Sequence, residues 1–239
     1  MSKLRDLVID AHGGLGRWKS VQTIEGDMSI TGVMWAMKGW PDALKAVNVT
    51  ARTQSQWISY RPFVNAELRS VCTPEHTTIE TTSGRMVRDR RNPREAFRDH
   101  ARDTKWDDLN LAYFSGYAMW NYLNAPFIFA LDGVTAEEIA AWDDNGERRR
   151  RLKVTFPDSI ATHCSEQVFH IDDDGLIRRL DYSAQVVGGI PTAHYLSDYK
   201  DFGGLKIATK RRAHRRNPDG TSIPEPIAVA IDIADIRLA

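Results

Sequence analysis

Hydrophobic and polar residues alternate along most of this chain, and that pattern predicts extended strands. Between residues 21 and 32, Ile24, Met28 and Ile30 alternate with Glu25 and Asp27, as in a strand with one buried face. Comparable alternation occurs at 67–72, 148–156 and 227–238, among other segments. We count about ten strands in all.

Short turns join most of these strands. The segments 83–85, 143–146, 172–175 and 217–220 each combine glycine with polar residues, and such turns are typical of β-hairpins. A hairpin pairs its two strands antiparallel. The strands are therefore expected to form one long antiparallel sheet.

Two segments have helical rather than alternating spacing. Residues 2–12 place Leu4, Leu7 and Val8 on one face, and the glycines at 13 and 14 end the segment. Residues 106–123 are apolar around nearly the whole circumference, which indicates a buried helix that ends or kinks at Pro126. Residues 127–131 continue the apolar segment.

Together these elements predict an α+β fold in a single domain covering residues 1–239. A long antiparallel sheet twists and curls. Helices at the start and middle of the chain must cover one of its faces. We therefore expect a half-barrel whose sheet wraps two or three helices.

Composition excludes several classes of function. Thirty-two basic residues balance thirty-two acidic ones, which argues against general attraction to nucleic acid. No stretch approaches the roughly 20 apolar residues of a transmembrane segment. The N-terminal residues lack the apolar core of a signal peptide, and Cys72 and Cys164 read as unpaired thiols. These observations favour a cytoplasmic protein, with the oligomeric state open.

Five segments together carry a resemblance to known proteins. They are AHGGLGRW at 11–18, LAYFSGYAMWNY at 111–122, TFPDSIATH at 155–163, RRLDY at 178–182 and AHYLSD at 193–198. This set resembles a group of uncharacterised bacterial and fungal proteins. Their helix-in-half-barrel layout is similar to the LolA/LolB superfamily of lipoprotein carriers. The resemblance implies an apolar cavity between sheet and helices that can hold acyl chains or similar molecules.

Aromatic residues are the candidates for binding such a ligand. Aromatic side chains dominate both protein cores and apolar ligand sites. The candidate ligand-binding residues are Trp35, Trp57, Phe114, Tyr117, Trp120, Phe127 and Phe129. Plain core packing is the alternative interpretation of the same residues.

Histidines supply an alternative, catalytic hypothesis. Adjacent antiparallel strands could bring His163, Asp181 and His194 together as acid–base residues, with Tyr182 donating to an oxyanion. Structural histidines are the competing interpretation. The chain has no clustered metal-ligand spacing, no phosphate-binding loop, no dinucleotide fingerprint and no nucleophile elbow, so we expect neither a metal nor a cofactor.

The sequence thus leaves three functions open. The leading hypothesis is binding of a small hydrophobic or amphipathic molecule in an apolar cavity beside the central helix. The second is a cofactor-independent enzyme acting on an apolar metabolite. The third is a structural or partner-binding protein with a filled core.

Overall fold

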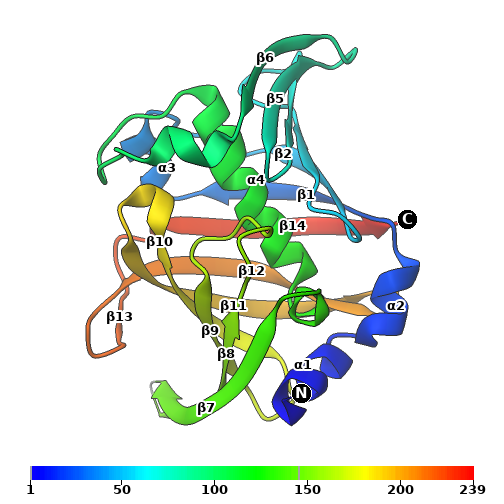
Figure 1. Cartoon of the computed structure of the whole chain (residues 1–239), viewed down its shortest axis with the longest axis vertical. Coiled ribbons are helices and arrows are strands. Elements are labelled where there is room, and N and C mark those ends of the chain that lie inside the picture. The colour runs from blue at the N-terminus through cyan, green and yellow to red at the C-terminus, as the bar shows by residue number, and fades with distance from the viewer. Residues whose placement is uncertain (1, 145) are drawn as a thin grey trace.

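The computed structural model describes residues 2–144 and 146–239, and a single antiparallel sheet organises them. Its strand order is β6-β5-β4-β3-β2-β1-β14-β12-β11-β10-β9-β8-β7, with the short β13 paired to β12. The sheet curves and stays open, so the α+β half-barrel expected from the sequence is confirmed (Figure 1).

Two strand meanders make up this sheet. The first contains β1 (Thr23–Thr31), β2 (Val47–Arg52), β3 (Ile58–Arg61), β4 (Leu68–Cys72), β5 (His76–Thr81) and β6 (Met86–Arg91). The second contains β7 (Thr135–Asp144), β8 (Glu147–Thr155), β9 (Glu166–Ile171), β10 (Ile177–Ala184), β11 (Ile190–Phe202), β12 (Leu205–Arg216), β13 (Ser222–Ile223) and β14 (Val229–Leu238). β1 pairs with β14, so the first and last strands of the chain join the two meanders.

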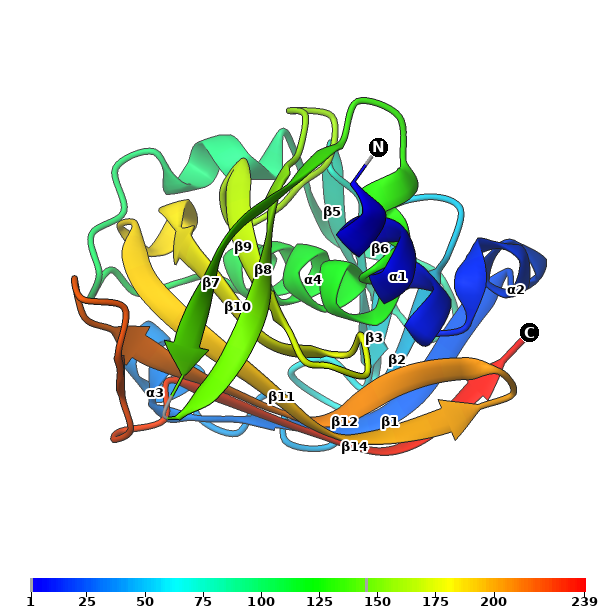
Figure 2. The same cartoon turned by 90° about the horizontal axis from the view of Figure 1, so that it is seen from below.

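The central helix α4 (Asp108–Asn124) links the two edges of the sheet. It follows edge strand β6 and precedes edge strand β7, and the sheet bends around it (Figure 2). Every residue of α4 is buried, as the all-round apolar pattern predicts. Asp107 caps its first turn by accepting from the Asn110 backbone N–H at 2.7 Å. Pro126, which has no N–H to offer the helix, follows its end.

Shorter helices close the rest of the hollow. They are α1 (Lys3–Ala11), α2 (Gly14–Ser20), α3 (Val33–Lys38) and the 3₁₀ turns η1 (Pro93–Phe97), η2 (Phe127–Ala130) and η3 (Gln185–Val187). α1 buries Leu4, Val8 and Ile9. α2 buries Trp18, which stacks on Phe127 with 5.7 Å between ring centroids. The end of the half-barrel near the C-terminus of α4 is thereby covered.

Several details differ from the sequence-based expectations. The described residues form 14 strands rather than about ten, partly because 45–60 divides into β2 and β3. Helices α2 and α3 were not expected, since each is shorter than two full turns and leaves little periodicity to detect. The expected hairpin at 143–146 connects β7 and β8, but its residue 145 lies outside the described residues. Both cysteines are free, as the sequence suggested.

Candidate functional site

A buried polar cluster lies between α4 and the sheet, centred on His163. The His163 ring is hydrogen-bonded on both sides: Nδ1 is 3.1 Å from the Tyr117 hydroxyl and Nε2 is 2.7 Å from the Tyr122 hydroxyl. The Tyr122 hydroxyl is also 3.1 Å from that of Tyr182. The Tyr182 ring stacks on His163 with 4.0 Å between centroids. Tyr117 and Tyr122 on α4 therefore fix a histidine that lies in the loop between β8 and β9.

His194 belongs to the same interior, but its ring makes no hydrogen bond with the residues that the structure describes. It pairs with Leu180 across β10 and β11, which places it on the face that also carries Tyr182. Its ring meets Tyr122 edge-on at 4.6 Å. Both ring nitrogens are buried without a partner among the described residues. An unsatisfied buried polar group is costly, so the imidazole of His194 calls for an explanation.

Asp181 does not join these histidines, contrary to the catalytic hypothesis. Consecutive strand residues point to opposite faces, so Asp181 faces outward while its neighbour Tyr182 faces α4. On that outer face Asp181 Oδ1 accepts from Arg179 Nε at 2.7 Å, and Oδ2 lies 3.2 Å from His170 Nε2. The catalytic hypothesis expected His163, Asp181 and His194 to lie together. In the structure only the two histidines share this interior, and the Tyr182 ring contacts both of them.

Burial keeps these histidines neutral. Loss of solvent lowers the pKa of His163 to about 3 and, helped by the positive charge of Arg211, lowers the pKa of His194 well below its ordinary value. Burial likewise raises the pKa of Tyr122 to about 12. No carboxylate is hydrogen-bonded to His163 or His194 among the described residues. The cluster thus lacks the carboxylate that the acid–base hypothesis assigned to it.

Three cavities follow one another along the interface between α4 and the sheet. The outermost holds about 120 Å³ and lies beneath α3. Phe114, Tyr182 and Val229 separate it from a middle cavity of about 30 Å³, since all three line both. Tyr122 in turn separates the middle cavity from an inner one of about 20 Å³. The side chains on α4 therefore leave the hollow of the sheet incompletely filled.

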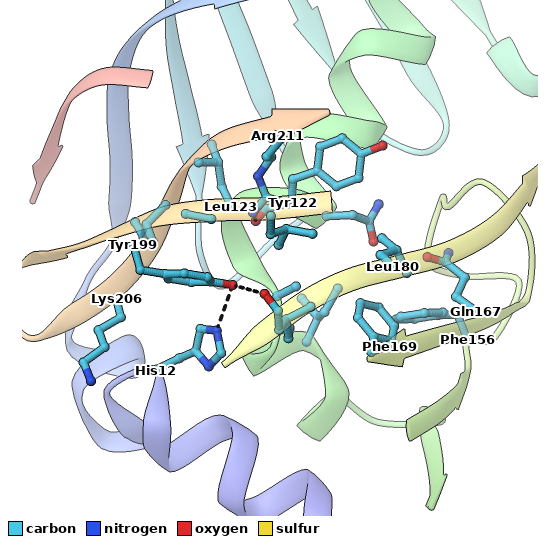
Figure 3. A pocket seen from close by; sticks show the side chains of 17 residues that line it. His12, Tyr122, Leu123, Phe156, Gln167, Phe169, Leu180, Tyr199, Lys206 and Arg211 are labelled. Carbon is cyan, nitrogen blue, oxygen red and sulfur yellow. Dashed lines mark hydrogen bonds between the residues drawn. The ribbon is translucent and has the colours of Figure 1, made fainter. Parts of the chain in front are cut away.

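The inner cavity combines apolar walls with cationic groups. Figure 3 shows Phe156, Phe169 and Leu180 on one side, and Arg211 next to Tyr122 on another. His12, Tyr199 and Lys206 lie together near α1 (Figure 3). The Tyr199 hydroxyl donates to the Ile177 carbonyl at 2.7 Å and lies 3.5 Å from His12 Nε2. Burial lowers the pKa of His12 to about 4, so this histidine is also neutral.

The aromatic candidates from the sequence divide into two groups. Trp35 and Phe114 line the cavities, and Tyr117 holds His163. The other four pack elsewhere. Trp57 lies against Arg52 near the surface, Trp120 donates to backbone carbonyls at Arg52 and Ser55, Phe127 stacks on Trp18, and Phe129 meets Phe169.

Sequence reasoning missed Arg211, His12 and Tyr199. Arg211 follows Lys210 and precedes Arg212 on a strand, so it reads as part of a solvent-exposed basic run. The one available signal is the period of two along β12, which puts Arg211 on the same face as Leu205 and Ile207. Only 4% of the Arg211 surface is exposed.

The described residues also bear on other classes of site. They contain no group of three or more His, Cys, Asp or Glu side chains arranged to hold a metal ion. None of their helices has both the length and the apolarity to cross a bilayer.

Comparison with known proteins defines the fold. No family model matches the chain, and no curated protein matches it significantly. Solved structures do match. A DUF1329 family protein from Desulfovibrio piger has a TM-score of 0.56 at 13% identity, covering 98% of this chain and 91% of that one. A LolA superfamily protein from Nitrosomonas europaea has a TM-score of 0.52 at 9% identity, covering 97% and 92%.

A third solved structure is a putative outer membrane lipoprotein-sorting protein domain from Vibrio parahaemolyticus. It has a TM-score of 0.52 at 9% identity and covers 95% of this chain and 93% of that one. All three likenesses extend over nearly the whole chain. The architecture is therefore LolA-like, as the resemblance in the sequence implied.

Proposed function

We propose that this protein binds a small hydrophobic or amphipathic molecule between α4 and the sheet. The observation that carries the proposal is the row of three cavities, each sharing a wall with the next. Protein interiors are normally packed as densely as organic crystals, with few voids larger than a water molecule. A row of adjacent voids along one helix, divided only by side chains, suits a linear apolar ligand.

The walls suit an apolar chain. Ile30, Trp35, Met119 and Ile231 line the middle cavity, and Val33, Met34 and Met37 line the outer one. Methionine side chains are flexible and adapt to ligands of varied shape. The likeness to a lipoprotein-sorting domain supports the proposal in general terms, because a lipoprotein carries acyl chains.

Helix α3 supplies the entrance in this proposal. It is six residues long and lies between Gly32 and Gly39, whose φ angles of 120° and 94° are accessible to glycine at little cost. Val33 on α3 is 44% exposed and lines the outer cavity as well. A ligand would enter beneath α3 and advance past Phe114 and Tyr182.

The three cavities together offer less space than a long acyl chain fills, so binding must widen them. Cavity walls built from rotatable aromatic and methionine side chains permit such widening without breaking the sheet. The polar cluster around His163 then lies beside the ligand path and positions Tyr122 and Tyr182.

Extraction of the purified native protein with organic solvent, followed by mass spectrometry, tests the proposal. We expect a lipid or apolar metabolite in stoichiometric amount, or else saturable binding of added amphiphiles to delipidated protein. A well-folded protein that yields no extract and shows no thermal shift with lipids or aromatic compounds would refute it. That outcome would favour the structural or partner-binding hypothesis.

A further inference from the structure

Among the described residues, Arg211 is a buried cation without a counter-ion. It extends from β12 into the interior, where it is 4% exposed and lines the inner cavity. Its Nε is buried without an acceptor among the described residues. The groups that act electrostatically on it are Tyr199, Tyr122 and Tyr182, whose raised pKa values leave them uncharged at neutral pH. An isolated buried charge is among the most unfavourable groups a protein can hold.

A contact with the C-terminal end of α4 explains in part why Arg211 is buried. Nη2 of Arg211 donates to the Tyr122 carbonyl oxygen at 2.7 Å. That carbonyl lacks its usual helical partner because the residue four positions later is Pro126, which has no N–H. The helix end also carries a partial negative charge. One carbonyl uses one of the five guanidinium N–H groups, however, and a neutral donor would serve it equally well.

The surroundings of Arg211 favour an anion from outside the chain. The Tyr122 ring lies 5.1 Å from the guanidinium carbon, and Lys206 lines the same cavity. His12 and His194 are the nearby titratable rings, and both experience the positive charge of Arg211. Among the described residues, none of those that line the inner cavity is an aspartate or glutamate. This end of the cavity row is thus positive, while its middle is apolar.

We infer that the ligand is a single-chain anionic amphiphile, of the fatty-carboxylate class, whose head group binds Arg211 in the inner cavity. This inference rests on the proposed function and specifies the ligand for the same site. The carboxylate would receive N–H groups of Arg211, and the chain would pass Tyr122 into the middle and outer cavities. The head group therefore enters first, and the methyl end lies beneath α3.

Three probes that share one chain and differ in head-group charge test the inference. They are dodecanoate, methyl dodecanoate and dodecyltrimethylammonium, titrated into delipidated protein below their micelle concentrations by isothermal calorimetry. We expect dodecanoate to bind at least tenfold more tightly than the ester, and the cation to bind more weakly than either. A charge-assisted hydrogen bond is strong enough for such a ratio.

Two arginine variants locate the effect. Arg211→Met should remove the preference for dodecanoate over the ester, and Arg211→Lys should retain it. Arg212→Met is the matched control, because Arg212 lies next along β12, faces outward and pairs with Asp232 at 2.6 Å. The control should keep the wild-type preference. Thermal unfolding should show little change in stability for Arg211→Met, since losing the desolvation cost of a buried unpaired charge offsets losing the hydrogen bond to the Tyr122 carbonyl.

The outcomes separate the inference from the proposed function. Equal binding of ester and carboxylate by wild type would overturn the anionic ligand and leave apolar binding intact. Binding of no probe would count against both. If Arg211→Met loses stability and its affinity for every probe equally, Arg211 is a structural cap of α4. If that variant does not fold, the wild-type probe series together with Arg211→Lys still decides the matter.

Discussion

Acid should destabilise this protein well before its carboxylates titrate, because several histidines are buried in the neutral form. Two of them have defined pKa values: about 3 for His163 and about 4 for His12. Their unfolded-state pKa is near 6.5. Between these values the unfolded chain binds protons that the folded protein does not, so the free energy of unfolding falls as the pH falls.

The size of the loss follows from linkage. Each histidine whose pKa drops from about 6.5 to 4 or below contributes a loss of about 2 kcal/mol between pH 8 and pH 5. His163 and His12 together therefore account for about 4 kcal/mol, and His194 adds a loss of the same sign. Domains are commonly stable by only about 5–15 kcal/mol. A loss of this size is a substantial share of the stability of a typical domain, so the free energy of unfolding should be clearly lower at pH 5 than at pH 8.

Urea unfolding monitored by tryptophan fluorescence at pH 8, 7, 6 and 5 measures this loss. His163→Gln should reduce the loss between pH 8 and 5 by about 2 kcal/mol, because one of the titrating groups is gone. Tyr117→Phe is the matched control. It removes a hydroxyl partner of His163 and should lower stability at every pH while leaving the dependence on pH nearly unchanged.

Parallel stability curves for wild type and His163→Gln would refute the reasoning. They would mean that His163 reaches solvent or an acidic partner in the folded protein. A flat wild-type curve between pH 8 and 5 would refute it for all the buried histidines together.

Three further predictions concern packing and ligand access. Gly116→Ala should destabilise by about 1–3 kcal/mol despite the higher helix propensity of alanine, because its Cβ would lie 2.7 Å from Cys72 Cβ; urea unfolding equal to wild type would contradict this. Ala184→Leu, which extends into the outer cavity, should weaken amphiphile binding at least tenfold in calorimetry, whereas Ala140→Leu on exposed β7 should not. Arg179→Met should cost about 3–5 kcal/mol, since it leaves the buried Asp181 and the partly buried Asp144 on the outer face with fewer partners; an unchanged urea midpoint would show that the ion pairs are dispensable.

Local patterns were sufficient to identify most elements of the fold. The alternation at residues 21–32 predicted a strand, which the structure shows as β1. The apolar segment at 106–123 predicted a buried helix, which the structure shows as α4. Both predictions rest on periodicity, which is a property of neighbouring residues and needs no knowledge of the rest of the chain. Short helices such as α3 escaped detection because six residues hold too little of a period.

The site was only partly accessible from sequence. His163, Tyr182 and His194 were named correctly as neighbours, since consecutive antiparallel strands and their connecting loop lie close in space. Asp181 was assigned to the wrong face of the sheet. It is adjacent to Tyr182 in β10, and adjacent strand residues point to opposite faces. Arg211 was overlooked because its basic neighbours in sequence made it look exposed.

The sequence by itself thus determined the strands, the buried helix and the α+β half-barrel, because hydrophobic periodicity and turn chemistry act over short range. Tertiary structure alone decided the pairing of β1 with β14, the row of cavities along α4 and the burial of Arg211. Each of these depends on segments far apart in the chain meeting across the curve of the sheet. Whether a side chain on such a strand contacts water, the core or a cavity depends on which distant segment packs against that face of the sheet. Local sequence patterns contain no information about that segment.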